Sequence, residues 1–380
     1  MKAHRALVVL GTRPEAIKQA PVVWAMQSRP GSFDVKVVNT GQHREMLTPM
    51  LELLGIKPDL SLDLMEPNQT LASLTARCVS AMDRVLLEWR PDAVVVQGDT
   101  TTAMAAGLAA FYRQIPVAHV EAGLRSGSLT EPFPEEANRI WIDAVAHWRF
   151  APTERAAGFL RAEARGSDGV YVTGNTVVDA LTVVRDRLGR SSGAPRGVPP
   201  EALAPGRRIV LVTCHRRESF GDGIHAIARA IARIALERPD VNFVYPLHMN
   251  PNVRGPMRET LGSARNVYLV EPLEYDAFVR VMERATLVLT DSGGVQEEAP
   301  SFGVPVLVMR NRTERPEGIE AGCAMLVGNE EDGIVSAACM LLGDAEKHAR
   351  MAHAANPYGD GHAGARIAEI LASDLDRVSP

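Results

Sequence analysis

The sequence lacks paired cysteines, an excess of basic residues and long apolar runs. Its four cysteines among 380 residues show no CxxC spacing, which excludes a disulfide framework and a cysteine-based zinc site. The formal net charge of -5 lacks the basic excess that nucleic acids and anionic membranes attract. No run reaches the roughly 20 apolar residues that span a bilayer, and the short apolar stretch near the N-terminus is not typical of a secretory leader. We therefore expect a cytoplasmic protein with reduced thiols, and neither nucleic acid nor membrane as a partner.

Two cofactor signatures are missing as well. No Gly-x-Gly-x-x-Gly follows the first expected strand, so the fingerprint of dinucleotide binding is absent. The sequence also shows no clustered metal-ligand spacing. We therefore predict no cofactor: turnover should need neither NAD nor a metal ion.

Short, β-branched apolar runs alternate with longer segments of helical spacing, a pattern typical of βαβ units and parallel sheets. The chain is long enough for two cores. Expected strands in the first half are 6–10, 35–39, 93–97, 117–120, 147–151 and 170–173. Those in the second half are 209–213, 242–246, 267–270, 287–290, 306–308 and 325–327, with a helix over 224–237. The Pro-rich segment 189–206 predicts a loop or linker without a regular element. The predicted fold class is α/β, with two Rossmann-like, doubly wound domains facing each other across a cleft.

Five polar, turn-rich motifs directly follow expected strands. They are Gly11–Glu15, Gly98–Thr102, His119–Gly123, Cys214–Glu218 and Asp291–Gly294. In open parallel sheets, ligands bind beyond the carboxyl ends of the strands, where helix N-termini present unpaired N–H groups. The five motifs therefore predict the walls of one cleft.

The segment Asp291–Gly294 is the candidate phosphate site. It precedes a helix expected near Val295, so its N–H groups could approach a phosphate, although a tight turn capped by Ser292 is the alternative. Glu297 and Glu298, expected in the first turn, suit the helix dipole and could accept bonds from ribose hydroxyls. Several cations near strand ends could clamp a pyrophosphate or could be solvated surface charges: Arg13, Lys18, Arg216, Arg217, Arg310, Arg312 and Arg315.

Carboxylates collect at the ends of neighbouring strands. Asp99 and Glu121 follow strands that would lie about 5 Å apart, so they could converge as acid and base; Asp99 could instead only cap the next helix. Glu135, in the segment Pro132–Glu136, could add a third carboxylate or cap a helix. His215 could be an acid, a phosphate ligand or a satisfied structural histidine. Residue types alone predict a two-domain enzyme that binds a nucleotide diphosphate and places carboxylates opposite it.

Ten motifs occur in order between about residue 6 and about residue 370: Gly11–Lys18, Gly41–Met46, Gly98–Thr102, His119–Arg125, Pro134–Arg139, Thr173–Thr176, His215–Glu218, Thr290–Gly294, Gln296–Pro300 and Asn356–Gly361. Together they resemble the motifs of the bacterial non-hydrolysing UDP-N-acetylglucosamine 2-epimerases. The resemblance implies a homodimer with the GT-B-like fold. It also implies domains over 1–173 and 174–363, with a last helix at about 364–380 packing back on the first domain.

The resemblance also implies a reaction that feeds surface polysaccharide synthesis. In the family, UDP leaves as the C2 proton is lost, which gives 2-acetamidoglucal; UDP returns after C2 is protonated from the other face. The catalytic positions would be Asp99, Glu121, Glu135 and His215, with His215 steadying the departing UDP. The nucleotide would be held by Arg13, Lys18, Leu273, Phe278, Ser292, Gly293, Gly294, Glu298 and Arg315. Leu273 stands where some members have Gln beside the base.

In some members a second UDP-N-acetylglucosamine binds beside the catalytic site and activates the enzyme. The matching positions are Gln42, His43, Glu45 and Asn68, where Glu45 replaces a Gln and Asn68 replaces an Arg. A gained anion and a lost cation predict weak or absent activation. The alternatives are a hydrolysing epimerase and a GT-B glycosyltransferase. A non-catalytic sugar-nucleotide sensor would not need all the carboxylates and the histidine.

Overall fold

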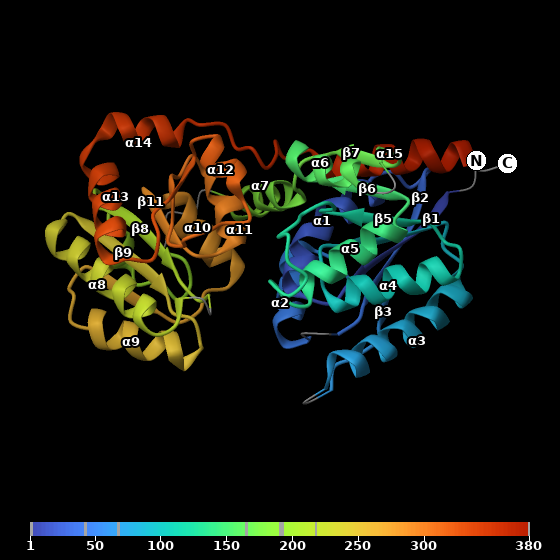
Figure 1. The fold of residues 1–380 in the computed structure, drawn as a ribbon, viewed down its shortest axis with the longest axis horizontal. Coiled ribbons are helices and arrows are strands. Elements are labelled where there is room, and N and C mark those ends of the chain that lie inside the picture. The colour runs from blue at the N-terminus through green and yellow to red at the C-terminus, as the bar shows by residue number, and fades with distance from the viewer. Residues whose placement is uncertain are drawn as a thin grey trace. The chain divides into compact units, whose positions relative to one another are not determined.

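The computed structural model describes residues 3–41, 44–66, 69–163, 166–189, 194–216 and 219–378. The chain forms two compact units: unit 1 comprises Met1–Thr182 and Tyr358–Pro380, and unit 2 comprises Val183–Pro357. Unit 1 therefore combines the blue and green part of the chain with its red C-terminal helix, whereas unit 2 is continuous in sequence (Figure 1). Among the described residues, none of the helices combines the length and the apolar character that crossing a membrane requires.

Unit 1 is built on a seven-stranded parallel sheet in the order β3-β2-β1-β4-β5-β6-β7. Its strands are β1 (His4–Leu10), β2 (Phe33–Asn39), β3 (Leu60–Ser61), β4 (Ala93–Gln97), β5 (Val117–Val120), β6 (Trp148–Ala151) and β7 (Val170–Val172). Its helices are α1 (Arg13–Gln27), α2 (Arg44–Leu54), α3 (Leu71–Trp89), α4 (Thr101–Tyr112), α5 (Glu135–Val145), α6 (Glu154–Ala162) and α15 (Ala363–Val378). The strand order reverses between β1 and β4, and ligands of doubly wound folds bind at such a switch point.

Unit 2 contains a six-stranded parallel sheet in the order β10-β9-β8-β11-β12-β13. The strands are β8 (Arg208–Thr213), β9 (Val241–Pro246), β10 (Val267–Val270), β11 (Leu287–Thr290), β12 (Val306–Val308) and β13 (Ala324–Leu326). The helices are α8 (Asp222–Glu237), α9 (Pro251–Leu261), α10 (Tyr275–Arg284), α11 (Gly293–Glu298), α12 (Pro316–Glu320), α13 (Glu331–Gly343) and α14 (Ala345–Ala352), with 3-10 turns η1 (Pro200–Leu203) and η3 (Ala299–Phe302). The order reverses between β8 and β11, so these two strand ends form the switch point of unit 2.

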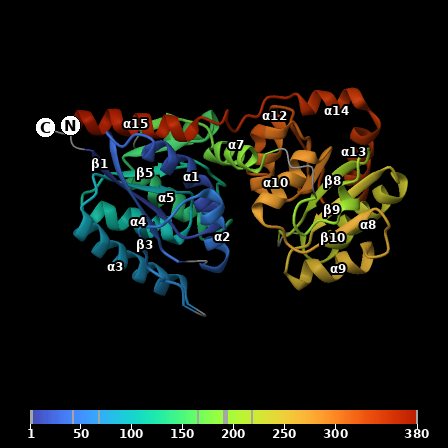
Figure 2. The same ribbon diagram turned by 180° about the vertical axis from the view of Figure 1, so that it is seen from behind.

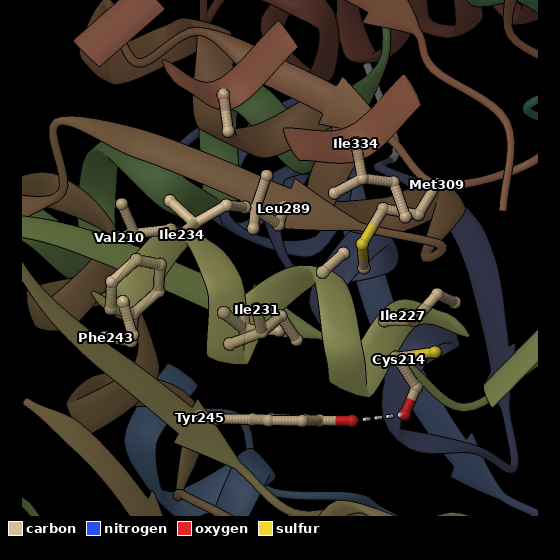
Figure 3. Close-up of a cluster of buried hydrophobic side chains, with 14 of the residues drawn as sticks. Val210, Cys214, Ile227, Ile231, Ile234, Phe243, Tyr245, Leu289, Met309 and Ile334 are labelled. Carbon is tan, nitrogen blue, oxygen red and sulfur yellow. Dashed lines mark hydrogen bonds between the residues drawn. The ribbon is translucent and has the colours of Figure 1, made fainter. Parts of the chain in front are cut away.

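The core of unit 2 shows why the amphipathic segment after β8 becomes a helix. Ile227, Ile231 and Ile234 recur at helical spacing, so they form one face of α8, and all three are fully buried. Figure 3 shows them in a row beside side chains of the sheet such as Phe243. Burying each such side chain contributes roughly 1.5–3 kcal/mol.

Helix α7 (Thr176–Leu188) begins in unit 1 and ends in unit 2. The residue before α7 is hydrogen-bonded to the C-terminal segment of unit 1, because the Asn175 N–H donates to the Tyr358 carbonyl at 2.6 Å. The Gly364 N–H likewise donates to Asp179 Oδ1 at 2.8 Å. The boundaries between the two units lie at 182/183 and 357/358, whereas the family resemblance implies boundaries at 173/174 and 363/364.

Helix α15 packs against α1, as both ribbon views show (Figures 1 and 2). A Cβ atom at Gly364 would lie 2.6 Å from the Pro21 carbonyl oxygen, so glycine permits the close approach of the two helices. Ile367, Ala368 and Leu371 of α15 are fully buried. The last helix is therefore part of the core of unit 1.

The predicted fold class of two Rossmann-like parallel-sheet domains is confirmed. Two local expectations are wrong. The sequence predicts no strand at 60–61, but β3 pairs there with β2 at the edge of the sheet. The segment 189–206 is expected to hold no regular element, but η1 forms within it, because the side chain of Asn242 donates to the carbonyls of Glu201 and Ala202 at 3.0 and 3.1 Å.

Candidate active site

Glu121 is the most constrained of the predicted catalytic residues. It follows β5 with φ 66°, a left-handed conformation that non-glycine residues rarely adopt and that is often found at functional sites. Both of its carboxylate oxygens accept hydrogen bonds from Lys18 Nζ, at 2.6 and 2.7 Å. The side-chain amide of Gln97 donates to the same carboxylate. With its side chain only 6% exposed, Glu121 is therefore held in a fixed orientation with a cation beside it.

Asp99 follows β4 after Gly98 and pairs with Arg139 of α5 at 2.7 Å. It does not cap the next helix: Thr100 is the N-cap of α4, and its hydroxyl accepts from the Ala103 N–H at 3.0 Å. The capping interpretation of Asp99 is therefore wrong, because the adjacent threonine takes that position. The Asp99 side chain is 28% exposed and is the more accessible partner of its ion pair.

Glu135 is the first residue of α5, yet this helix has no side-chain cap bond at its N-cap Pro134. The Oε2 atom of Glu135 is buried, and none of the described residues forms a hydrogen bond with it. Its neighbour Glu136 accepts instead from the N–H groups of Ser126 and Gly127, at 2.9 and 3.2 Å. Buried polar atoms are nearly always paired, so this oxygen marks Glu135 as a candidate for a chemical role.

Glu15 connects the turn after β1 to the turn after β4 through hydrogen bonds. Its Oε2 accepts from the N–H groups of Gly11 and Thr12, at 2.9 and 2.7 Å, and its Oε1 accepts from the Thr100 hydroxyl at 2.6 Å. Burial raises the pKa of the Glu15 carboxyl, and these hydrogen bonds offset the rise only in part. The turn after β1 is thus fixed to the residue that follows Asp99.

His215 lies beyond β8 in unit 2. The N–H groups of His215 and Arg216 both donate to Asp291 Oδ2 at 2.8 Å, so the turns after β8 and β11 are joined. The His215 ring stacks on His248 with 5.5 Å between centroids, and its side chain is 39% exposed. Burial lowers the pKa of His215, and His248 and Arg216 lower it further, against the opposing effect of Asp291. A neutral imidazole offers one donor and one acceptor nitrogen.

Three of the five arginines predicted near strand ends of unit 2 converge on Glu314. Arg216, Arg310 and Arg315 lie 3.0, 2.6 and 3.1 Å from its carboxylate. Burial raises the pKa of Glu314, but the three guanidinium groups lower it more, to about 2. Glu297 also binds Arg315, at 2.7 Å. Such a cluster suits a ligand with several negative charges, and we call it the arginine cluster.

Gly293 and Arg315, which are both predicted to bind the nucleotide, are neighbours in the structure. A Cβ atom at Gly293 would lie 2.6 Å from the guanidinium carbon of Arg315, so only glycine lets that group lie against the start of α11. Ser292 is the N-cap without a side-chain cap bond, and a Cβ at Gly294 would meet open space. The alternative of a serine-capped turn is therefore wrong.

Glu297 and Glu298 are expected in the first turn of α11, but this expectation is wrong. The helix begins at Gly293, not near Val295, so no acidic residue lies in the first turn. Glu298 is buried and accepts from the Tyr275 hydroxyl at 3.1 Å.

Other residues predicted for the site take no part in the contacts given above or are not among the described residues. Arg13 begins α1, Leu273 is buried, Phe278 is half-buried in α10, and Arg312 is exposed. Gln42, His43, Asn68 and Arg217 lie outside the described residues, as does the side chain of Glu45. In the part of the chain that is described, no group of three or more His, Cys, Asp or Glu residues could hold a metal ion.

Four contributing residues have no role in the sequence-based prediction: Gln97, Arg139, His248 and Glu314. Two of them carry a signal in the sequence. Gln97 is a polar residue that ends an apolar strand, and Glu314 is the single acid in the arginine-rich segment 310–315. The roles of Arg139 and His248 depend on tertiary contacts that no local pattern predicts.

Comparison with known proteins gives a consistent result. A model of the UDP-N-acetylglucosamine 2-epimerase family matches residues 25–372. The probable UDP-N-acetylglucosamine 2-epimerase of Ralstonia nicotianae is 51% identical over 370 residues, covering 97% of this chain and 98% of the relative. The UDP-N-acetylglucosamine 2-epimerase of Escherichia coli is 49% identical over 369 residues, with the same coverage of 97% and 98%.

Solved structures agree with this result. The crystal structure of the Neisseria meningitidis UDP-GlcNAc 2-epimerase bound to UDP-GlcNAc matches with a TM-score of 0.89 and 45% identity, covering 97% of this chain and 100% of that one. The predicted family is thus confirmed: this chain belongs to the UDP-N-acetylglucosamine 2-epimerase family.

Proposed function

We propose that this chain reversibly converts UDP-N-acetylglucosamine into UDP-N-acetylmannosamine without hydrolysis. The observation that supports this most is Glu121, which has a left-handed backbone and a carboxylate held by Lys18 and Gln97. Glu121 follows β5, the neighbour of the strand that Asp99 follows. Glu135 adds a buried carboxylate oxygen that has no hydrogen-bond partner among the residues that the structure describes. Positioned carboxylates of this kind are what exchange of the C2 proton requires.

The proposed chemistry balances without a redox partner. A carboxylate accepts the C2 proton, the electron pair of the C–H bond forms a C1=C2 double bond, and the C1–O bond breaks as UDP leaves. The intermediate is 2-acetamidoglucal. A carboxyl group that carries a proton then protonates C2 from the other face and becomes a carboxylate, and a UDP oxygen adds again at C1. Asp99, Glu121 and Glu135 carry out the proton exchange as a group.

Most of the residues that we assign to the nucleotide lie in unit 2. We propose that the arginine cluster and the turn 292–294 bind the pyrophosphate, that His215 steadies the departing UDP, and that Glu298 binds the ribose. Leu273 and Phe278 would lie near the uracil. Arg13 and Lys18 of unit 1 complete the set, and Lys18 also hydrogen-bonds both oxygens of Glu121.

The decisive experiment is turnover of UDP-N-acetylglucosamine in deuterated water by dialysed, chelator-treated protein. We expect NMR to show a mixture of the two UDP-sugars, with deuterium at C2 of the product and no requirement for NAD or metal. Retention of the original hydrogen would contradict the elimination mechanism. Release of free N-acetylmannosamine and UDP would instead identify a hydrolysing epimerase.

We further propose that activation by a second substrate molecule is weak or absent, because Glu45 and Asn68 replace a Gln and an Arg of activated members. Losing a charge-assisted bond costs roughly 1.5–3 kcal/mol, or about tenfold or more in affinity. The reverse reaction from UDP-N-acetylmannosamine should therefore start without a lag. The measurement is its progress curve with and without a trace of UDP-N-acetylglucosamine. A negligible rate until that trace is supplied would show that the second site is intact.

We also propose a cytoplasmic homodimer that supplies surface polysaccharide synthesis. All four cysteines are free thiols, which suits a reducing compartment. Light scattering should give twice the 41.1 kDa mass of the chain. A mass of one chain at assay concentration would contradict the dimer.

A further inference from the structure

His119 is a fully buried histidine on β5 whose two ring nitrogens both face acceptors. Its Nε2 lies 2.8 Å from the Gly98 carbonyl oxygen, and its Nδ1 lies 2.6 Å from Asp143 Oδ1 of α5. The side chains of His119 and Asp143 are each 0% exposed, so this contact is closed to substrate.

Asp143 extends the contact to the turn that contains Glu121. Its Oδ2 accepts from the Gly123 N–H at 3.2 Å and from Arg125 at 2.7 Å. Burial raises the pKa of Asp143, but His119 and Arg125 lower it below its usual range. A Cβ at Gly123, where φ is 85°, would lie 2.4 Å from the Ala156 carbonyl oxygen, so α6 confines this turn on its other side.

The hydrogen bonds of His119 and Asp143 end at Gly98 and Gly123, which are close in sequence to the proposed proton-exchanging residues. Gly98, which accepts from His119, directly precedes Asp99, and its φ of 71° sets the direction of the chain there. Gly123, which donates to Asp143, lies two residues after Glu121. One imidazole ring therefore joins the turn of Asp99 to the turn of Glu121.

We propose that His119 is a positioning residue that, through the Gly98 carbonyl and through Asp143, holds Asp99 and Glu121 in the arrangement needed for proton exchange at C2. This inference rests on the proposed epimerase function. A displacement of about 1 Å in a reacting group can cost about 10²-fold in rate, so loss of either hydrogen bond should appear in kcat. Binding of UDP, which is assigned mostly to unit 2, should not change.

Two substitutions separate the two hydrogen bonds. In His119→Asn the side-chain amide falls near the position of Nδ1 and can still donate to Asp143, but the bond to Gly98 is lost. In His119→Gln the amide reaches toward the position of Nε2 and can still donate to Gly98, but the bond to Asp143 is lost. We expect each variant to lower kcat by about 10- to 100-fold, with an unchanged KM for UDP-N-acetylglucosamine and an unchanged Kd for UDP.

The matched control is His4→Asn. His4 is 8% exposed and forms the same kind of pair, with Asp376 at 2.8 Å. It lies at the amino end of β1, whereas Asp99 and Glu121 follow the carboxyl ends of their strands. This variant should lower the midpoint of thermal unfolding and leave kcat per folded molecule unchanged. If neither His119 variant folds, Arg125→Lys, which alters the outer contact to Asp143, should lower kcat without changing UDP binding.

The outcomes are distinct. Normal kcat in both folded His119 variants, with thermal midpoints lowered as in the His4 control, would overturn the positioning role and leave the proposed function intact. If only the Arg125→Lys variant folds, its normal kcat would overturn the role in the same way. Absence of epimerisation by the unmodified chain would overturn the proposed function itself, and the role that depends on it.

Discussion

Glu121→Gln, Asp99→Asn and Glu135→Gln should each lower kcat for epimerisation by at least about 10²-fold, because an amide can neither accept nor deliver the C2 proton. The effect should be largest at Glu121, since Gln removes a negative charge that Lys18 balances where the side chain is only 6% exposed, whereas Asp99 is 28% exposed. Initial rates followed by NMR and UDP binding followed by calorimetry are the measurements. UDP should still bind, at least to the Glu135 variant, because the carboxylates belong to unit 1.

Asp83→Asn is the control for these substitutions. Asp83 also pairs with an arginine, Arg113 at 2.6 Å, but its side chain is 41% exposed and lies in α3. Exposed pairs contribute little to stability, so this variant should match the unmodified rate. Near-normal rates in all three carboxylate variants would remove these residues from the mechanism.

Arg315→Met should weaken UDP binding by about 10- to 100-fold. Each charge-assisted hydrogen bond contributes roughly 1.5–3 kcal/mol, and each 1.4 kcal/mol is about tenfold in affinity. The substitution also leaves Glu297 and Glu314 without one of their cations, so their negative charges would repel the phosphates. Calorimetric titration with UDP measures the effect directly.

Gly293→Ala provides an independent test of the same contact, because its Cβ would displace the Arg315 guanidinium from α11. We expect it to weaken UDP binding in the same direction. Arg229→Met is the control, since Arg229 pairs with Glu331 on the surface and its side chain is 57% exposed. If Arg315→Met binds UDP as well as the unmodified chain does, the arginine cluster is not the pyrophosphate site.

Strands buried on both faces were the most predictable part of the fold. The bounds of the fully buried strands β4, β5, β11 and β12 coincide with the expected ranges, because β-branched apolar runs define them. The bounds of β10 coincide as well, although this edge strand is partly exposed. The two-residue edge strand β3 carries no such signal, since both of its residues are exposed. Its pairing with β2 depends on tertiary structure alone.

The sequence predicts which residues should form the candidate site, but it does not predict how they pair. Motif positions place Asp99 and Glu121 after adjacent strands, as the register of β4 and β5 shows. That Asp99 pairs with Arg139, and that Lys18 reaches Glu121, depends on how α1 and α5 pack on the sheet. Likewise, only the structure decides that Thr100 rather than Asp99 caps α4, because both residue types cap helices well.

The placement of α15 has a consequence for synthesis on the ribosome. Domains generally fold as units during translation, from the N-terminus onward. Unit 1 departs from this order, because its last helix is encoded after the whole of unit 2. We expect unit 2 to finish folding first, while the nascent unit 1 exposes the strip of α1 around Pro21 that later receives Gly364. Until the 16 residues of α15 emerge, that strip is open to chaperones and to other nascent chains, so this stage is the most vulnerable to aggregation.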